Sequence, residues 1–484
     1  MKKYIVILIL IIFLPNLVDF TFGRDGAVFA YMGSLLCKGK IPYIDGFDHK
    51  GISIYLINAF GYLIGFKNLI GIRILELGLM IASFLSLYKS IVINYSKKVA
   101  GTAIIFGLLT LKYFFDDGNL TEEYGAYFVL IALALVLKTK QNKLDYLIIG
   151  FLFVINFTIR ANLIAFWPAL FLALLITPLT NKNNIKTFKN QFIKMVFGAL
   201  IAIGSLTIYF LVTHSFSNFY QDAFVYNFSY AKQSVSEIIL SIISSTRRYE
   251  VSIIMILAFV ISIVSFIKQR AVFLELLLIF WIPLELYLSN MSGKLFAHYY
   301  IMWMPLIIIS VVVIFNYFKE VYLSNEQLIV IMIITVFLCF QIPIFMTLTS
   351  YKNMFSNNQT NTQKTVNYIN DKYKDSSILV WGNETAIYNL TNKRATIPYF
   401  FQTFFKLESP QTKMMIEDFT NKIIAHSPDV IIDVKTSSLL FLDLSNQAII
   451  EQNQKENLEP YFKFVNENYY LAESKFDADY YVRN

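Results

Sequence analysis

The residues YIVILILIIFLPNLVDF (4–20) are followed almost at once by GRDGAVFAYMGSLLCKGKIPYIDGFDHKG (23–51). The first stretch is apolar and about long enough to cross a bilayer as a helix. The second gathers ionisable groups among aromatic residues and glycines. These groups include Arg24, Asp25, Asp45, Asp48, His49 and Lys50. The contrast predicts a membrane helix that ends in a charged loop, and the rest of the chain must explain why the charge collects there.

The composition indicates a membrane protein. The chain is 56% hydrophobic and only 15% charged, whereas soluble domains carry about 25% charged residues. Its apolar residues form blocks of roughly 17–22 residues, which suits helices that cross about 30 Å of hydrocarbon. The net charge of +8 does not indicate nucleic acid as a partner, because most Lys and Arg residues lie in short loops between apolar blocks.

We predict a polytopic α-helical membrane protein with about 11 spans. The segment 52–66 is shorter, and we expect it to be interfacial or half-inserted. Met1 to Val18 has no small-residue cleavage site, so we expect it to remain as the first membrane helix. The predicted spans lie near 4–20, 69–93, 99–115, 124–138, 144–158, 161–179, 194–213, 250–267, 271–289, 298–317 and 327–349.

Lysine and arginine residues concentrate on alternate loops, which identifies the cytoplasmic side. A multi-pass protein of the cell membrane follows, with its N-terminus in the cytoplasm. The stretch 19–51 and everything after about residue 350 then lie outside.

The last part of the chain is more polar and reads as a separate domain. Buried strands are predicted at 376–382 and 428–434, a helix at 411–426, and later strands in YYLAESKF (469–476) and ADYYVRN (478–484). Strands that alternate with a helix indicate a small α/β domain. We therefore predict a transmembrane domain over 1–349, with an outward active-site loop at 19–51, and an extracytoplasmic α/β domain over 350–484.

Asp25 is the first candidate for chemistry. The segment AVFAYMGSLLCKGK (27–40) has helical apolar spacing and is predicted to form an amphipathic helix at the outer interface. Asp25 would lie at its N-terminal end, where a negative charge is favourable. The alternative is a solvated loop carboxylate paired with Arg24.

Asp48 and Lys50 precede the next apolar segment in DHKGISIY (48–55). Lys50 is either a lysine whose stem lies along the membrane or a cation that binds a lipid phosphate. His49 is more simply a polar loop residue than a metal ligand, because no second histidine lies at ligand spacing.

The outward loop DDGNLTEEYG (116–125) places Glu122 and Glu123 close behind two aspartates. Such a cluster indicates a metal ion, a raised pKa or simply an acidic helix start. Arg160, in FTIRANL, needs an anionic partner at its depth. Lys294 and His298 come from the outward stretch GKLFAHYYIMWMP (293–305).

Acids and cations are thus expected on one membrane face. Carboxylates can deprotonate an attacking hydroxyl or bind a metal, and cations can stabilise a departing phosphate. This set of residues is suited to chemistry on a lipid-phosphate substrate.

These residues resemble the GT-C glycosyltransferases, in particular bacterial relatives of protein O-mannosyltransferases and of the lipid A aminoarabinose transferase. The resemblance lies in Asp25 after the first span, the G-x-x-P-Y element (Gly39 to Tyr43), and the D-x-K element of DHKGISIY. It extends to an acid at 122 or 123, HYYIMWMP (298–305), and VWGNETAIYNLTNKR (380–394). The family commonly has K-P-P-L where this chain has Lys50, Gly51 and Ile52.

The resemblance implies transfer of a sugar from a polyprenyl-phosphate donor to a glycan, lipid or protein acceptor on the outer face, with inversion. Asp25 would be the base. Lys50, with Arg160 or Lys294, would stabilise the polyprenyl phosphate, and Asp48 and His298 would join the substrate pocket. Glu122 or Glu123 would orient the acceptor or a metal. The family is divided on metal use, so a divalent cation stays open.

Three alternatives remain at this point. A transporter or lipid flippase would use polar groups inside the membrane, such as Glu76 and Glu275. A polymerase or ligase of lipid-linked glycans would perform a sister reaction. A non-enzymatic assembly subunit would need none of the loop acids.

Overall fold

The computed structural model describes residues 1–180, 185–230, 233–269, 273–321, 327, 340–356, 359–407, 409–435 and 452–484. The chain forms two compact units, neither of which is continuous in sequence. Unit 1 comprises Met1–Val18, Arg73–Val212 and Ala231–Phe355, and unit 2 comprises Asp19–Ile72, Thr213–Tyr230 and Ser356–Asn484. The predicted boundary between a transmembrane domain (1–349) and an extracytoplasmic domain (350–484) stays a prediction.

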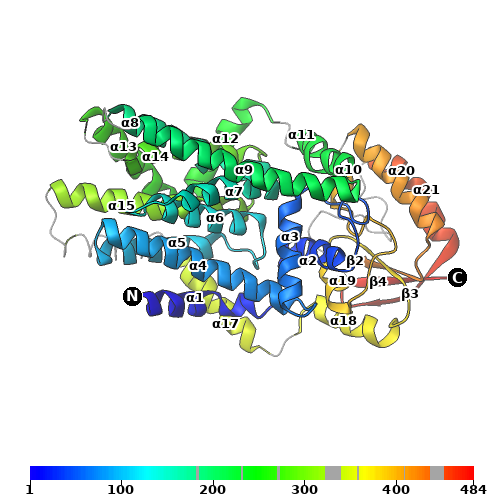
Figure 1. Ribbon diagram of the computed structural model, residues 1–484. Helices are drawn as coiled ribbons and strands as arrows, with labels where there is room; N and C mark the ends of the chain where they lie inside the picture. The colour runs from blue at the N-terminus through cyan, green and yellow to red at the C-terminus, as the bar shows by residue number, and fades with distance from the viewer. Residues whose placement is uncertain are drawn as a thin grey trace. The chain divides into compact units, whose positions relative to one another are not determined.

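Unit 1 is built from apolar helices. They pack in pairs, with α5 beside α15 and α8 beside α14 (Figure 1). The helices are α1 (Lys2–Leu17), α4 (Ile70–Asn94), α5 (Lys97–Phe114), α6 (Thr121–Val136), α7 (Lys143–Ile159), η1 (Ala161–Ile164), α8 (Phe166–Thr180), α9 (Ile185–Thr213), α12 (Val235–Arg248), α13 (Ser252–Ile267), α14 (Phe273–Asn290), η3 (Ala297–Met302), α15 (Trp303–Val321) and α17 (Gln341–Phe355). Helix α4 begins in unit 2, at Ile70.

Each apolar block predicted before residue 320 coincides with a helix or, at 161–179 and 298–317, with two successive helical elements, and 52–66 contains α3 (Ile52–Ile64). The number of spans is not confirmed. Within the described residues, four helices are long and apolar enough to cross a membrane, or five if the bent pair α12 and α13 counts as one span. Many of the other helices fall short of the required length. The predicted span 327–349 lies largely outside the described residues.

Unit 2 combines two N-terminal helices with a small sheet. Helix α2 (Gly23–Cys37) packs on α3 and on α19 (Ala386–Thr391), so distant segments of the chain lie side by side (Figure 1). The remaining elements are α10 (Phe216–Tyr220), η2 (Gln221–Val225), α11 (Tyr226–Tyr230), α18 (Asn361–Lys372), β1 (Ile378–Trp381), η4 (Thr403–Lys406), α20 (Pro410–Ala425), β2 (Val430–Val434), α21 (Gln452–Asn468), β3 (Tyr469–Lys475) and β4 (Ala478–Arg483). The predicted strands and the helix at 411–426 are confirmed.

The sheet has the strand order β1-β2-β4-β3, with β1 parallel to β2 and the other pairs antiparallel. Register places Trp381 in one row with Asp433, and Val380 in the next row with Tyr480. Successive residues of a strand point to opposite faces. Trp381 contacts rings from α20 and α21, whereas Tyr480 contacts Tyr368 of α18. The sheet is therefore covered by helices on both faces.

Candidate functional site

Helix α2 carries Asp25 in its first turn. A left-handed residue, Phe22 (φ 62°), turns the chain into the helix. The sequence predicts an amphipathic helix with one face at the interface. The helix is present, but residues 26–35 are all buried, because α3 and α19 pack against it. Asp25 at its start is only partly buried.

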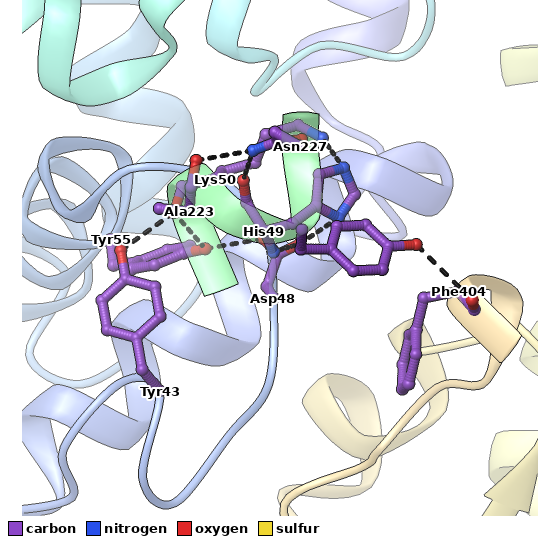
Figure 2. A network of polar contacts seen from close by, with 9 residues as sticks. Tyr43, Asp48, His49, Lys50, Tyr55, Ala223, Asn227 and Phe404 are labelled. Atoms are coloured by element: carbon purple, nitrogen blue, oxygen red, sulfur yellow. Dashed lines mark hydrogen bonds and ion pairs between the residues drawn. The ribbon is translucent and has the colours of Figure 1, made fainter. Parts of the chain in front are cut away.

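Asp48 lies in the loop between α2 and α3 and is held by two hydrogen bonds (Figure 2). Tyr55 donates its hydroxyl to Asp48 Oδ2 at 2.7 Å, and the His49 N–H donates to Asp48 Oδ1 at 2.8 Å. Tyr43 and Tyr55 also donate to the Lys50 carbonyl, at 2.9 and 3.3 Å. Two buried tyrosines therefore fix the loop around a buried carboxylate.

Lys50 and His49 form a pair of side chains in the same loop. Lys50 Nζ lies 2.7 Å from His49 Nε2, and His49 Nδ1 lies 3.4 Å from Asp48 Oδ1. Since an ammonium can only donate, His49 Nε2 is the acceptor of this contact. The three residues thus form a chain from carboxylate through imidazole to ammonium.

Three carboxylates share this electrostatic environment. Burial raises the pKa of Asp48, while the Lys50 charge and the two hydrogen bonds oppose the rise and the Asp25 charge adds to it. Burial and the Asp48 charge raise the pKa of Asp222, on η2, to about 8. Asp25 and Asp48, predicted separately, are thus close enough to interact. Asp222 was not predicted, although it is the only acidic residue between positions 214 and 236.

Unit 1 contains a second charged cluster. Arg160 ends α7 and forms an ion pair with Glu122 at the start of α6. Its guanidinium lies 4.3 Å from the centre of the Tyr299 ring. Glu122 also accepts a hydrogen bond of 2.7 Å from the Thr121 hydroxyl. The predicted anionic partner of Arg160 is therefore a carboxylate of the protein itself.

The neighbouring loop is held by an ion pair inside α4. Arg73 Nη1 donates to Glu76 Oε2 at 2.8 Å, and Arg73 Nη2 donates to the Asp117 carbonyl at 2.8 Å. Glu76 Oε1 accepts the Asn119 N–H at 3.1 Å. Glu123 accepts the Leu120 N–H at 2.9 Å and so caps α6. Arg73, which the sequence analysis missed, gives Glu76 a structural role in holding this loop. The presence of Glu76 in an apolar helix therefore does not require a role in transport.

The remaining predicted residues are more peripheral. His298 Nδ1 lies 3.5 Å from Asp116 Oδ2, and its ring stacks on Phe296. The Lys294 side chain is exposed. Among the residues that the structure describes, no three His, Cys, Asp or Glu side chains come together to hold a metal ion. Glu122 and Glu123 are engaged in the contacts given above.

The predicted residues therefore fall into two groups. Asp25, Asp48 and Lys50 belong to unit 2, and their cluster includes His49 and Asp222. The other group belongs to unit 1. Its members are Glu122, Glu123, Arg160, Lys294 and His298.

Solved structures share this architecture over nearly the whole chain. ArnT from Cupriavidus metallidurans in the apo state aligns with a TM-score of 0.58 and 10% identity, covering 99% of this chain and 97% of ArnT. The same protein bound to undecaprenyl phosphate aligns with a TM-score of 0.56 and 11% identity, covering 99% of this chain and 98% of ArnT. AglB from Archaeoglobus fulgidus, in complex with an inhibitory peptide and a dolichol-phosphate, aligns with a TM-score of 0.52 and 10% identity, covering all of this chain and 74% of AglB.

At these identities the likeness establishes the fold, and the predicted resemblance to the GT-C glycosyltransferases is confirmed at that level. A comparison with curated protein sequences finds no match. The family model described as "Putative competence-induced protein Ccs4 N-terminal domain" matches residues 3–308. This match spans more than half of the 484 residues. The chain therefore belongs to the Ccs4 family.

Proposed function

We propose that the protein transfers a sugar from a polyprenyl-phosphate-linked donor to an acceptor of the cell envelope. The fold supports this proposal, because the structures that share it include ArnT bound to undecaprenyl phosphate and AglB bound to a dolichol-phosphate. The acceptor is a hydroxyl-bearing glycan, lipid or protein. The reaction takes place at the outer face of the cell membrane, with the N-terminus in the cytoplasm and residues 350–484 outside.

One observation carries the proposal. Asp25, Asp48 and Lys50 form one electrostatic cluster in unit 2, although they come from a helix start and from the loop that follows it. A group that accepts a proton and a group that stabilises a departing phosphate are needed together in such a transfer. Asp48 is 2% exposed and accepts two hydrogen bonds. We therefore assign the role of base to the more accessible Asp25.

The proposed step is a single displacement with inversion. The acceptor hydroxyl oxygen attacks the anomeric carbon while Asp25 takes its proton. The bond between that carbon and the phosphate oxygen breaks, and the polyprenyl phosphate leaves with both electrons. Lys50 stabilises the negative charge that develops on the phosphate. Asp48 and His49 hold the Lys50 ammonium in place.

In unit 1, Arg160 already has Glu122 as its counter-ion. We propose that the Arg160–Glu122 pair keeps a fixed guanidinium edge available for phosphate, so that Glu122 orients Arg160. Glu123 caps α6. Lys294, in the loop before η3, and His298, in the first turn of η3, would contact the substrate. The outer α/β domain would select the acceptor.

The experiment uses the full-length protein in nanodiscs with radiolabelled polyprenyl-phosphate hexoses and a fraction of cell-envelope glycans. We expect label to move from one of these donors to an acceptor. A polymerase or ligase would instead use only donors that carry an oligosaccharide. Absence of transfer from every donor, combined with movement of a labelled lipid between leaflets, would contradict the proposal and favour a flippase.

A further inference from the structure

A helical segment from a distant part of the chain reaches the loop that holds Lys50. The elements α10, η2 and α11 follow one another over residues 216–230, and η2 is a π-helical turn. Such turns are rare and are frequently found at functional sites. A π turn also displaces backbone carbonyls from their regular partners, so a side chain near it can bind one of them.

Asn227 of α11 donates two hydrogen bonds to backbone carbonyls, one of them in the π turn (Figure 2). Its amide Nδ2 donates to the Ala223 carbonyl at 2.7 Å and to the His49 carbonyl at 2.7 Å. One amide nitrogen therefore joins the π turn to the loop before α3, across 178 residues of sequence. Both donor hydrogens of the amide are used.

The bonded carbonyl belongs to the peptide that links His49 to Lys50. Fixing this peptide restricts the backbone from which both side chains extend. Their ends, Lys50 Nζ and His49 Nε2, lie 2.7 Å apart. The adjacent residue of α11, Tyr226, places its ring 5.3 Å from the His49 imidazole. A lysine stem otherwise has about 2 kcal/mol of rotamer entropy to lose when its ammonium is held. The contacts from α11 therefore restrict the side chains that orient the ammonium.

We propose that Asn227 is a positioning residue that presets the Lys50 ammonium for the phosphate of a lipid-linked ligand. The inference rests on the proposed function for the identity of that ligand. It assigns to η2 and α11 the task of holding the phosphate-binding loop rather than contacting the sugar.

The test compares Asn227→Leu, which keeps the size but removes the donors, with Asn218→Leu, an exposed asparagine of α10. Both are measured alone and together with Lys50→Ala. Removing one part-buried hydrogen bond corresponds to roughly a tenfold loss. We expect Asn227→Leu to weaken binding of undecaprenyl phosphate, and to lower kcat/KM, by about tenfold, and Asn218→Leu to change neither.

The double variant separates positioning from general support of the fold. If Asn227 acts through Lys50, Asn227→Leu causes no further loss in the Lys50→Ala background. Two losses that multiply would overturn the inference, as would full binding by Asn227→Leu alone.

Amide hydrogen exchange provides a second measurement that needs no activity. In Asn227→Leu, exchange should rise over residues 43–51 and stay unchanged in β1 and β2. Protection that is lost in the whole of unit 2 would mean that the variant misfolds, and Asn227→Ser, which retains a shorter donor, should then restore part of the lipid binding. A failure of that rescue would overturn the inference.

The inference and the proposed function can fail separately. Tenfold weaker binding of undecaprenyl phosphate by Asn227→Leu, without sugar transfer by the wild type, would uphold the positioning role and contradict the transferase. If the wild type transfers sugar and Asn227→Leu transfers it equally well, the transferase is supported and the positioning role is contradicted. If the wild type does not bind undecaprenyl phosphate at all, the positioning inference is wrong.

Discussion

Tyr55 donates its hydroxyl to Asp48 Oδ2 at 2.7 Å, with both side chains buried. The tyrosine lies one turn inside α3 and the aspartate lies in the loop just before it. This bond therefore ties the charged loop to the helix that follows. The same hydroxyl lies 3.3 Å from the Lys50 carbonyl, so one phenol supports both the acidic and the basic residue.

Replacing Tyr55 with phenylalanine should loosen this loop. The change leaves a buried carboxylate with fewer donors, so we expect a loss of about 1–3 kcal/mol in the free energy of unfolding. Because the Tyr55 bond lowers the pKa of Asp48, that pKa should rise further. Denaturation in detergent measures the first effect. Tyr470→Phe, at an exposed tyrosine of the sheet, is the control, and equal stability of the two variants would contradict the prediction.

Asp222 should make stability depend on pH. Its pKa is raised from 3.8 to about 8 in the folded protein. Between these values the unfolded chain has released a proton that the folded chain retains, so stability falls as the pH rises from about 4 to about 8. Asp222→Asn should flatten part of this slope and be more stable than wild type at pH 8. Thermal unfolding measured across this range checks the prediction, and identical slopes would disprove it.

The ion pair between Arg160 and Glu122 should be essential to unit 1. Arg160→Gln leaves a carboxylate that is 2% exposed without its counter-ion, and such losses amount to about 3–5 kcal/mol. Adding Glu122→Gln removes the uncompensated charge, so the double variant should recover much of the stability. Chemical unfolding of the single and double variants measures this coupling. Strictly additive losses would show that the pair does not stabilise the fold.

Gly118 should tolerate no side chain. Its φ is +83°, and an added Cβ would lie 2.4 Å from Glu76 Oε1 and 2.6 Å from Arg73 Nη1. Gly39 has a similar φ of +74° but no atom within 4 Å. Both alanine variants incur backbone strain of about 1–2 kcal/mol, but only Gly118→Ala also disturbs the Arg73–Glu76 pair. We expect a clearly lower unfolding temperature for Gly118→Ala. Similar unfolding temperatures for Gly118→Ala and Gly39→Ala would contradict the stabilising role of the Arg73–Glu76 pair.

The sequence predicted the helices and strands well because their signals are local. Apolar blocks such as 69–93 and 144–158 match α4 and α7, and the buried runs at 376–382 and 428–434 match β1 and β2. The number of spans was less predictable, since several apolar helices, such as α6 and α7, fall short of 18 residues.

The charged sites depend on contacts that are distant in sequence. The two units each combine separate segments, and no local pattern shows that Asn227 bonds to His49 or that Asp222 approaches Asp48. Arg73 could have been found, because it lies three residues before Glu76 within an apolar helix and so faces the same side. Asp25 and Lys50 could be singled out as candidates because the charged stretch 23–51 follows an apolar segment, and their roles stay predictions.

The most direct test of the central claim is the rate of sugar transfer by Asp25→Asn, measured in a single turnover beside wild type and Asp45→Asn. Asp45 lies in the loop after α2, where it pairs with Lys40 and accepts the Ile41 N–H, so the control removes the same charge outside the proposed chemistry. Loss of a general base lowers a rate by about 10²–10⁴-fold. The account predicts such a loss for Asp25→Asn, with lipid-phosphate binding retained and with Asp45→Asn close to wild type. Transfer by Asp25→Asn at the rate of the control would contradict the assignment of Asp25 as the base.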